Sequence, residues 1–145
     1  MTQAESEQLT TGAASTAPAI GALSGLKVLD ASGWSGQYCG KLFSDLGAEV
    51  VLVEPYGGSP VRRDGPFLDN RPHIERSLPF AYLNAGKRSI ALNLDRPEGQ
   101  DIFKRLAAAS DLLIESEKPG VMASRGLDFA SLSAVAPKLV MTSIT

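Results

Sequence analysis

Short apolar runs alternate with segments of helical periodicity along most of the chain. The apolar runs cover residues 26–32, 49–54, 89–94, 111–116 and 139–144. Each has the length of a buried strand, and apolar positions continue through both faces rather than alternating with polar ones. Strands that alternate with helices at this spacing pair in parallel and are joined by right-handed crossovers. The pattern therefore predicts an α/β fold with a mainly parallel sheet and flanking helices.

Helical periodicity marks the segments between several of these runs. The predicted helices are residues 36–46, 96–109, 120–125 and 128–134. In the first, Tyr38, Leu42, Phe43 and Leu46 share one face, and Gly47 follows where a helix end favours a residue with positive φ.

The second predicted helix carries its own start signal. Asp95 and Glu98 have the spacing of a capping box, in which the side chains at the two positions bind backbone N–H groups of the first turn. Ile102, Phe103 and Leu106 then form an apolar stripe. We expect this stripe to pack on the sheet.

Three parts of the chain lack these patterns. Residues 56–80 are rich in Gly, Pro and Arg and are expected to form a long loop, a kind of segment that is often functional. Residues 1–22 are rich in Ala, Ser and Thr and contain no Lys or Arg, so they predict a disordered tail rather than a signal peptide. The last strand reaches Thr145 with no helix to cover it, as expected for a chain that stops in mid-fold or for an edge strand.

Composition excludes several classes of protein. The 145 residues contain 14 Lys and Arg against 16 Asp and Glu, a net charge of −2, which argues against a nucleic-acid or anionic-membrane binder. No apolar run approaches the roughly 18 to 20 residues that span a bilayer. The single cysteine excludes an internal disulfide, and we expect a cytoplasmic protein.

The first strand–helix turn is the usual place for a phosphate in open parallel sheets. Here it contains Gly33, Gly36 and Gly40, which do not match the GxGxxG dinucleotide fingerprint, although Glu54 ends the second strand where a ribose-binding acid would lie. Flexible turn residues explain these glycines equally well.

Residues 56–88 are locally basic, with six Lys and Arg against three Asp and Glu. Arg suits two-pronged phosphate contacts and Lys a point-charge contact. Arg62, Arg63, Lys87 and Arg88 are therefore candidates to face a phosphorylated cofactor, the alternative being ordinary solvated charges.

Other reactive side chains form no complete catalytic or metal-binding set. His73 is the only histidine, which leaves no Ser/His/Asp or Cys/His system with a histidine in reserve and no zinc cluster. Cys39 lies early in a helix, where the helix dipole lowers a thiol pKa, but a small buried apolar role is the more common one. Asp30 and Asp111 flank strands as structural caps or ligand contacts.

Seven segments together resemble the class III coenzyme A transferases, the CaiB/BaiF family, in order and approximate spacing. They are LSGLKVLD at 23–30, SDLGAEVVLVEP at 44–55, NAGKRSIALNL at 84–94, RPEG at 96–99, SDLLIES at 110–116, KPG at 118–120 and RGL at 125–127. The resemblance covers residues 23–145, so it identifies this segment with the N-terminal part of the family's large domain.

The resemblance implies a Rossmann-like domain that binds CoA or acyl-CoA without a metal, a smaller second domain, and two ring-shaped subunits interlocked as a homodimer. Transferases of this family use an aspartate that attacks the acyl-CoA thioester, which is covalent catalysis by a carboxylate. That aspartate follows the equivalent of strand 139–144 in relatives. No catalytic residue is therefore assigned here, and the chain is expected to be inactive alone.

The family's CoA contacts fall at three places in this sequence: the first turn, the end of the third strand, and the segment after the fourth strand. The residues implied to bind CoA are Trp34, Ser35, Leu92, Asn93, Leu94, Asp95 and Lys118. Relatives usually carry an aromatic residue where this chain has Glu117, a change that is expected to weaken binding of a polyanion.

The leading hypothesis is thus the N-terminal portion of an enzyme that transfers CoA between an acyl-CoA and a free carboxylic acid. A relative of α-methylacyl-CoA racemase is one alternative, and it would exchange the proton α to the thioester. A noncatalytic CoA-binding or assembly module is another. A dinucleotide-binding domain is disfavoured because the glycine fingerprint is absent.

Overall fold

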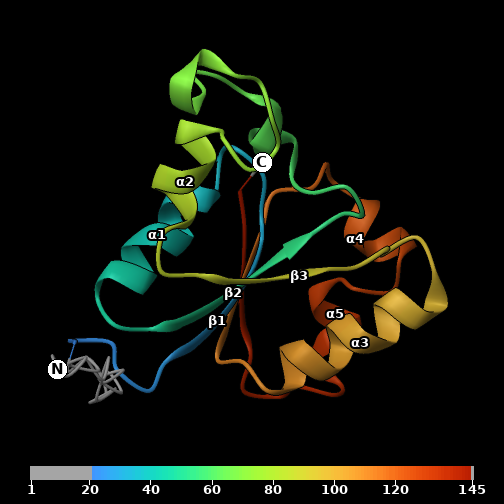
Figure 1. The fold of residues 1–145 in the computed structure, drawn as a ribbon. Coiled ribbons are helices and arrows are strands. Elements are labelled where there is room, and N and C mark those ends of the chain that lie inside the picture. The colour runs from blue at the N-terminus through green and yellow to red at the C-terminus, as the bar shows by residue number, and fades with distance from the viewer. Residues whose placement is uncertain (1–20, 145) are drawn as a thin grey trace, which may run out of the picture.

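A computed structural model describes residues 21–144 and shows five parallel strands in one sheet, in the order β3-β2-β1-β4-β5 (Figure 1). The strands are β1 (Lys27–Ala31), β2 (Glu49–Glu54), β3 (Arg88–Ala91), β4 (Leu112–Glu115) and β5 (Val140–Ser143). The chain moves to one side of β1 through β2 and β3, then returns to the other side through β4 and β5. The predicted α/β fold with a parallel sheet is confirmed.

Helices cover both faces of the sheet, which makes three layers (Figure 1). One face carries α1 (Gln37–Asp45) and α2 (Leu78–Asn84). The other carries α3 (Pro97–Ala108), α4 (Val121–Ser124) and α5 (Phe129–Ser133). The excursion between β2 and α2 contains two 3₁₀ turns, η1 (Pro60–Arg63) and η2 (Leu68–Asn70). Most of the predicted tail, residues 1–20, lies outside the described part of the chain, as does residue 145.

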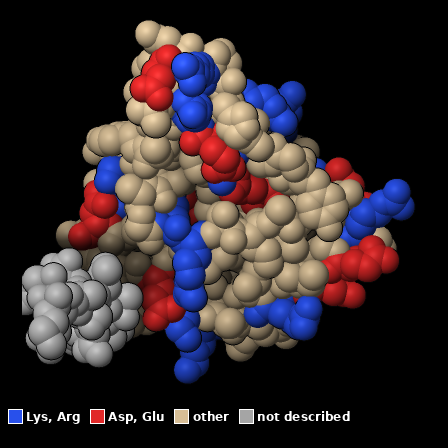
Figure 2. All heavy atoms as spheres, in the orientation of Figure 1, with Lys and Arg blue, Asp and Glu red and all other residues tan. Residues whose placement is uncertain are grey.

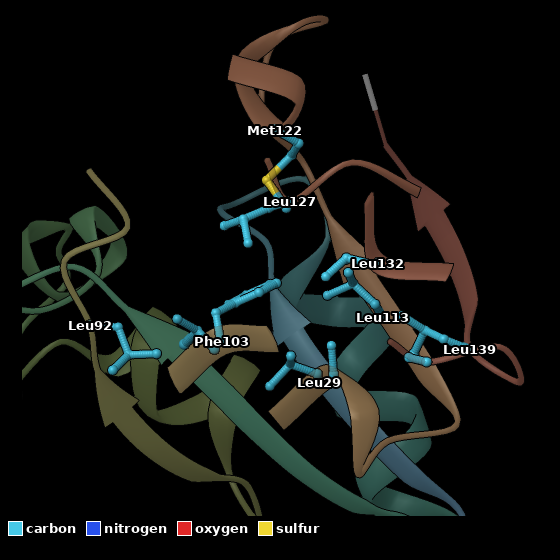
Figure 3. Close-up of a cluster of buried hydrophobic side chains, with 11 residues drawn as sticks. Leu29, Leu92, Phe103, Leu113, Met122, Leu127, Leu132 and Leu139 are labelled. Atoms are coloured by element: carbon cyan, nitrogen blue, oxygen red, sulfur yellow. The ribbon is translucent and has the colours of Figure 1, made fainter. Parts of the chain in front are cut away.

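The larger hydrophobic core lies between the sheet and α3, α4 and α5. Phe103 is fully buried at its centre, against Leu29 of the central strand β1 and Leu113 of the neighbouring β4 (Figure 3). The predicted stripe of α3 packs here, because Ile102 and Leu106 contact the same cluster. This burial is the main stabilising contribution to that side of the sheet.

Helix α1 turns only one edge of its predicted apolar face to the sheet, where Phe43 packs against the smaller buried cluster. Its buried residues are Gln37 and Gly40, whereas Tyr38 and Leu42 are exposed. The aromatic ring of Tyr38 stacks on Tyr82 of α2 instead, with ring centres 6.5 Å apart. Polar groups beneath α1, described below, decide this orientation. Gly47 ends the helix with a φ of +96°, as predicted.

Helix α2 begins at the end of the segment predicted as a loop, and the capping box of α3 is absent. Helix α2 begins at Ser77, whose side-chain oxygen accepts a hydrogen bond from the Phe80 N–H. The residue that caps α3 is Arg96, which makes no side-chain cap hydrogen bond. Asp95 is bound by an arginine elsewhere, so the capping-box prediction is wrong.

Among residues 21–144, no helix combines the length and the apolar character needed to cross a membrane.

Candidate functional site

A pocket of about 470 Å³ opens where the carboxyl ends of the strands meet. Its walls are the turns that follow β1, β2, β3 and β4, together with the end of α4. Strands β1 and β4 are neighbours in the sheet although β2 and β3 lie between them in the chain, so the connections diverge at this point. Open α/β sheets bind ligands at such a switch point.

The structure places part of the predicted CoA-binding set in this pocket. Leu92, Asn93, Leu94 and Asp95 all line it. Trp34, Ser35 and Lys118 do not, although Gly33, Ser116 and Glu117 beside them do. The Trp34 indole N–H donates instead to Asp64 at 2.5 Å. The three strand ends that the resemblance singles out therefore meet at one pocket, while these three side chains lie outside its lining.

The turn after β2 adds lining residues that the sequence did not single out. Tyr56, Ser59 and Pro60 line the pocket, and Tyr56 is largely exposed. Their position directly after the second strand could have predicted this, because residues there lie at the same edge of the sheet as the turns after the other strands.

The turn between β3 and α3 is fixed by close packing of the helix on its backbone. A Cβ at Gly99 would overlap the carbonyl oxygen of Asn93. The Asn93 side chain accepts a hydrogen bond from the Asp95 N–H at 3.0 Å, and the Gln100 amide donates to the Leu94 carbonyl at 3.0 Å. This wall of the pocket is therefore built by the first turn of α3.

Arg125 joins two turns across the pocket. Its Nε donates to an Asp95 oxygen at 2.8 Å, and its Nη1 donates to Glu117 at 2.9 Å. Burial lowers the pKa of Arg125, but the two carboxylates outweigh that effect and raise it overall. We call Arg125, Asp95 and Glu117 the arginine clasp. It connects the turn after β3 to the turn after β4.

Glu54 at the end of β2 is occupied by protein groups. Its carboxylate accepts two hydrogen bonds from Arg62, at 2.6 and 2.9 Å, and one from the Ser59 N–H at 2.8 Å. Burial raises the pKa of Glu54, but the hydrogen bonds from Arg62 and Ser59 outweigh burial and lower it overall. A carboxylate held in this way is not free to bind a ribose diol, which removes the main support for a dinucleotide site.

The candidate basic residues do not line the pocket. Arg62 binds Glu54, the Lys87 side chain is buried against Asp30, and Arg88 pairs with Glu49 at the start of β2. Arg63 donates to the Gly57 carbonyl. The charged residues that line the pocket are three carboxylates and Arg125. Figure 2 shows both signs of charge interspersed over the displayed face, with a group of acidic atoms near its middle.

The remaining candidate groups have structural roles. Burial raises the pKa of the Cys39 thiol and the charge of Asp30 raises it further, which is the opposite of an activated nucleophile. Asp111 accepts a hydrogen bond from the Lys27 N–H at 2.9 Å. Within residues 21–144, no group of three or more His, Cys, Asp and Glu side chains is placed to hold a metal ion.

A parallel sheet flanked by helices on both faces, with a pocket at its switch point, defines an open α/β protein. The chain belongs to CoA-transferase family III, whose sequence profile matches residues 23–145.

Relatives with curated functions support the same family. One subunit of succinyl-CoA:(R)-benzylsuccinate CoA-transferase from Thauera aromatica is 43% identical over 119 residues, which cover 82% of this chain and 29% of that protein. Succinate–glutarate CoA-transferase from Agrobacterium fabrum is 39% identical over 127 residues, covering 85% of this chain and 32% of that protein. This chain thus spans about a third of these relatives' length.

A crystal structure of a CaiB/BaiF family protein from Brucella suis has the same fold. It superposes with a TM-score of 0.79 at 38% sequence identity, covering 86% of this chain and 33% of that protein. The five-stranded parallel sheet and its flanking helices are therefore shared with a solved member of the family.

Proposed function

We propose that residues 23–145 form the CoA-binding part of an enzyme that transfers CoA between an acyl-CoA and a free carboxylic acid. The observation that carries the proposal is the pocket at the switch point. Three of the four turns that form its walls, those after β1, β3 and β4, are the turns to which the family resemblance assigns CoA contacts. Leu92, Asn93, Leu94 and Asp95 would contact the cofactor there, and no metal is required.

The names of the relatives support the transferase hypothesis and suggest a donor. Both curated relatives described above are named as CoA-transferases, which favours this reaction over the racemase alternative. Both names also contain a succinyl group or succinate, so succinyl-CoA is the first donor to test with any longer form of the protein. One relative is named as a subunit, which supports assembly with a second polypeptide.

The catalytic group is not among the residues proposed here. Trp34, Ser35 and Lys118 remain candidates for further contacts with the cofactor, because each lies beside residues that line the pocket. The wall is net acidic, so the phosphates of CoA would extend past the pocket towards solvent rather than lie against the carboxylates of the arginine clasp.

Isothermal titration of the purified chain with CoA, dephospho-CoA and NAD tests this proposal. We expect measurable CoA binding, and no comparable affinity for NAD because Glu54 is held by Arg62. Asn93→Ala should weaken CoA binding, and Asp101→Ala, on an exposed part of α3, is the matched control. A folded sample that binds NAD better than CoA contradicts the proposal.

A further inference from the structure

One buried side chain, that of Gln37, joins two walls of the pocket without lining the pocket itself. Ser32, after β1, and Ser59, after β2, both line the pocket. The Gln37 side-chain amide donates to the Ser32 carbonyl oxygen at 3.2 Å and to the Ser59 hydroxyl at 3.1 Å. Gln37 is fully buried at the start of α1. Both hydrogens of its amide group are therefore used to hold two separate turns.

Gln37 is itself fixed by residues that lie away from the pocket. Its side-chain oxygen accepts a hydrogen bond from the Asn84 amide at 2.9 Å. Its backbone carbonyl accepts one from the Lys87 ammonium group at 2.8 Å. Neither Asn84 nor Lys87 lines the pocket. Every polar atom of the Gln37 side chain thus has a partner, which leaves one orientation for it.

A buried ion pair anchors this arrangement to the central strand. The Lys87 ammonium group lies 2.8 Å from an Asp30 oxygen, and the two side chains are 1% and 0% exposed. The same ammonium group also donates to the Asn84 side-chain oxygen at 2.9 Å. The second Asp30 oxygen accepts hydrogen bonds from the backbone N–H of Ser32 and from its hydroxyl, at 3.0 and 2.5 Å.

A charged pair at this depth is expensive to bury, and apolar residues of similar size stabilise a fold at least as well. Stability alone therefore gives no reason for these residue types. Polar groups contribute a defined geometry instead, because each hydrogen bond fixes the position of its donor relative to its acceptor. In this network, the bonds lead from Lys87 through Asp30 and Gln37 to the two lining serines.

We propose that Gln37 and Lys87 are positioning residues for the pocket: they fix the turn after β1 relative to the turn after β2 without touching the ligand. This inference rests on the proposed function for its ligand, CoA. The geometry of the two turns is a separate property of the chain and is measurable without any ligand.

The central test compares Gln37→Met with the wild type. Methionine has a similar length but cannot donate to Ser32 or Ser59, so both turns lose their shared tether. We expect amide hydrogen exchange to accelerate together in residues 32–35 and 57–59. We also expect CoA affinity to fall about tenfold, as the loss of two positioning hydrogen bonds corresponds to roughly that factor.

Val50→Ala is the matched control for lost stability. Val50 is buried in β2 but lies outside the pocket lining, in the cluster beneath α1. It should lower the unfolding temperature while CoA affinity stays within about twofold and the two turns keep their exchange rates. If Gln37→Met lowers the unfolding temperature in the same way and changes neither turn nor affinity, the positioning role is wrong.

A second variant covers the case in which Gln37→Met does not fold. Asn84 lies in α2, 47 residues from Gln37 in the sequence, and does not line the pocket. Asn84→Ala removes the group that donates to the Gln37 side-chain oxygen and leaves every lining residue unchanged. Faster exchange in both turns supports the inference, and unchanged exchange in both overturns it. If the wild type does not bind CoA, the proposed function fails, while the exchange data still decide the positioning role.

Discussion

The guanidinium group of Arg62 binds both carboxylate oxygens of Glu54 and lies 3.8 Å from the centre of the Phe80 ring. It also pairs with Glu75. One side chain in η1 therefore connects the end of β2 to the start of α2. The excursion between these elements, predicted only as a loop, is held on the sheet by this contact.

Removing Arg62 should destabilise the fold strongly. Arg62→Met leaves the Glu54 carboxylate buried without its partner, which costs about 3–5 kcal/mol for a buried pair. The control is Arg88→Met, whose pair with Glu49 is exposed and contributes about 0–1 kcal/mol. Urea unfolding of the three proteins measures the difference. Equal losses in the free energy of unfolding would show that the buried pair stabilises the fold no more than the exposed pair does.

The same pair should make stability depend on pH. Because the pKa of Glu54 is lowered in the folded state, the unfolded state takes up the proton first. The contribution is complete above the ordinary glutamate pKa of about 4.3 and is lost as pH falls through the lower folded-state pKa. Glu54→Gln should flatten this acid dependence, whereas Glu49→Gln should not. Urea midpoints measured from about pH 6 to pH 3 test this, and parallel curves for all three proteins would contradict it.

Gly40→Ala should destabilise the protein, although alanine normally favours a helix interior by about 1 kcal/mol. A Cβ at this position would overlap an Asp30 carboxylate oxygen and lie 2.9 Å from the Lys87 ammonium group. The added methyl group must displace the buried ion pair, a cost of about 1–3 kcal/mol. The change in unfolding temperature shows whether the substitution stabilises or destabilises the protein. A higher unfolding temperature would show that α1 moves away freely.

Cys39 should react slowly with thiol reagents at neutral pH. Burial and the Asp30 carboxylate both raise the pKa of its thiol, so less thiolate is present than in a free cysteine. As Cys39 is the single cysteine, the absorbance change with a disulfide reagent reports on it alone. Unfolding in urea should restore the ordinary rate. If the folded protein reacts as fast as free cysteine, then burial and Asp30 do not suppress the thiolate of Cys39.

Glu117→Gln should tighten CoA binding if the proposed function is correct. The substitution removes one negative charge from a net acidic wall and loosens Arg125 from the arginine clasp. A single unit charge at several ångströms in water is worth about 0.5–0.7 kcal/mol, or roughly two- to fourfold in affinity. Added salt should reduce the gain. Asp101→Asn is the control, and titration calorimetry is the measurement. Weaker binding would contradict this prediction and show that the contact between Glu117 and Arg125 favours binding.

The sequence predicts the sheet well because its strands are short apolar runs buried between two layers of helices. Phe103 illustrates this: its periodic position on α3 predicts a core residue, and it is fully buried. The tendency of an apolar side chain to be buried depends on that residue itself, so the sequence pattern predicts it directly.

Helix α1 shows where such reasoning stops. Gln37 faces the sheet because Ser32, Ser59 and Asn84 supply hydrogen bonds from distant parts of the chain. Local periodicity contains no information about these partners. Helix α2 was recognisable in principle, since Ser77 caps it and Pro79 lies in its first turn.

The candidate site divides in the same way. The resemblance locates the three turns that meet at the pocket, including Leu92 and Asp95. It does not show that Arg125 bridges Asp95 to Glu117, because Arg125 and Asp95 are 30 residues apart in the sequence. The prediction that Asp95 caps α3 fails for the same reason: a stronger, charged partner competes for its carboxylate.

The close contact between Gly99 and the Asn93 backbone has a consequence for anyone who redesigns this protein. Position 99 does not line the pocket and is an ordinary helical position by its sequence neighbourhood, yet any larger residue there would collide with the Asn93 backbone and displace this turn of the pocket wall. Comparing only pocket-facing positions between family members would overlook it. A transplant of ligand preference from one member to another should therefore move residues 92–100 as a single block.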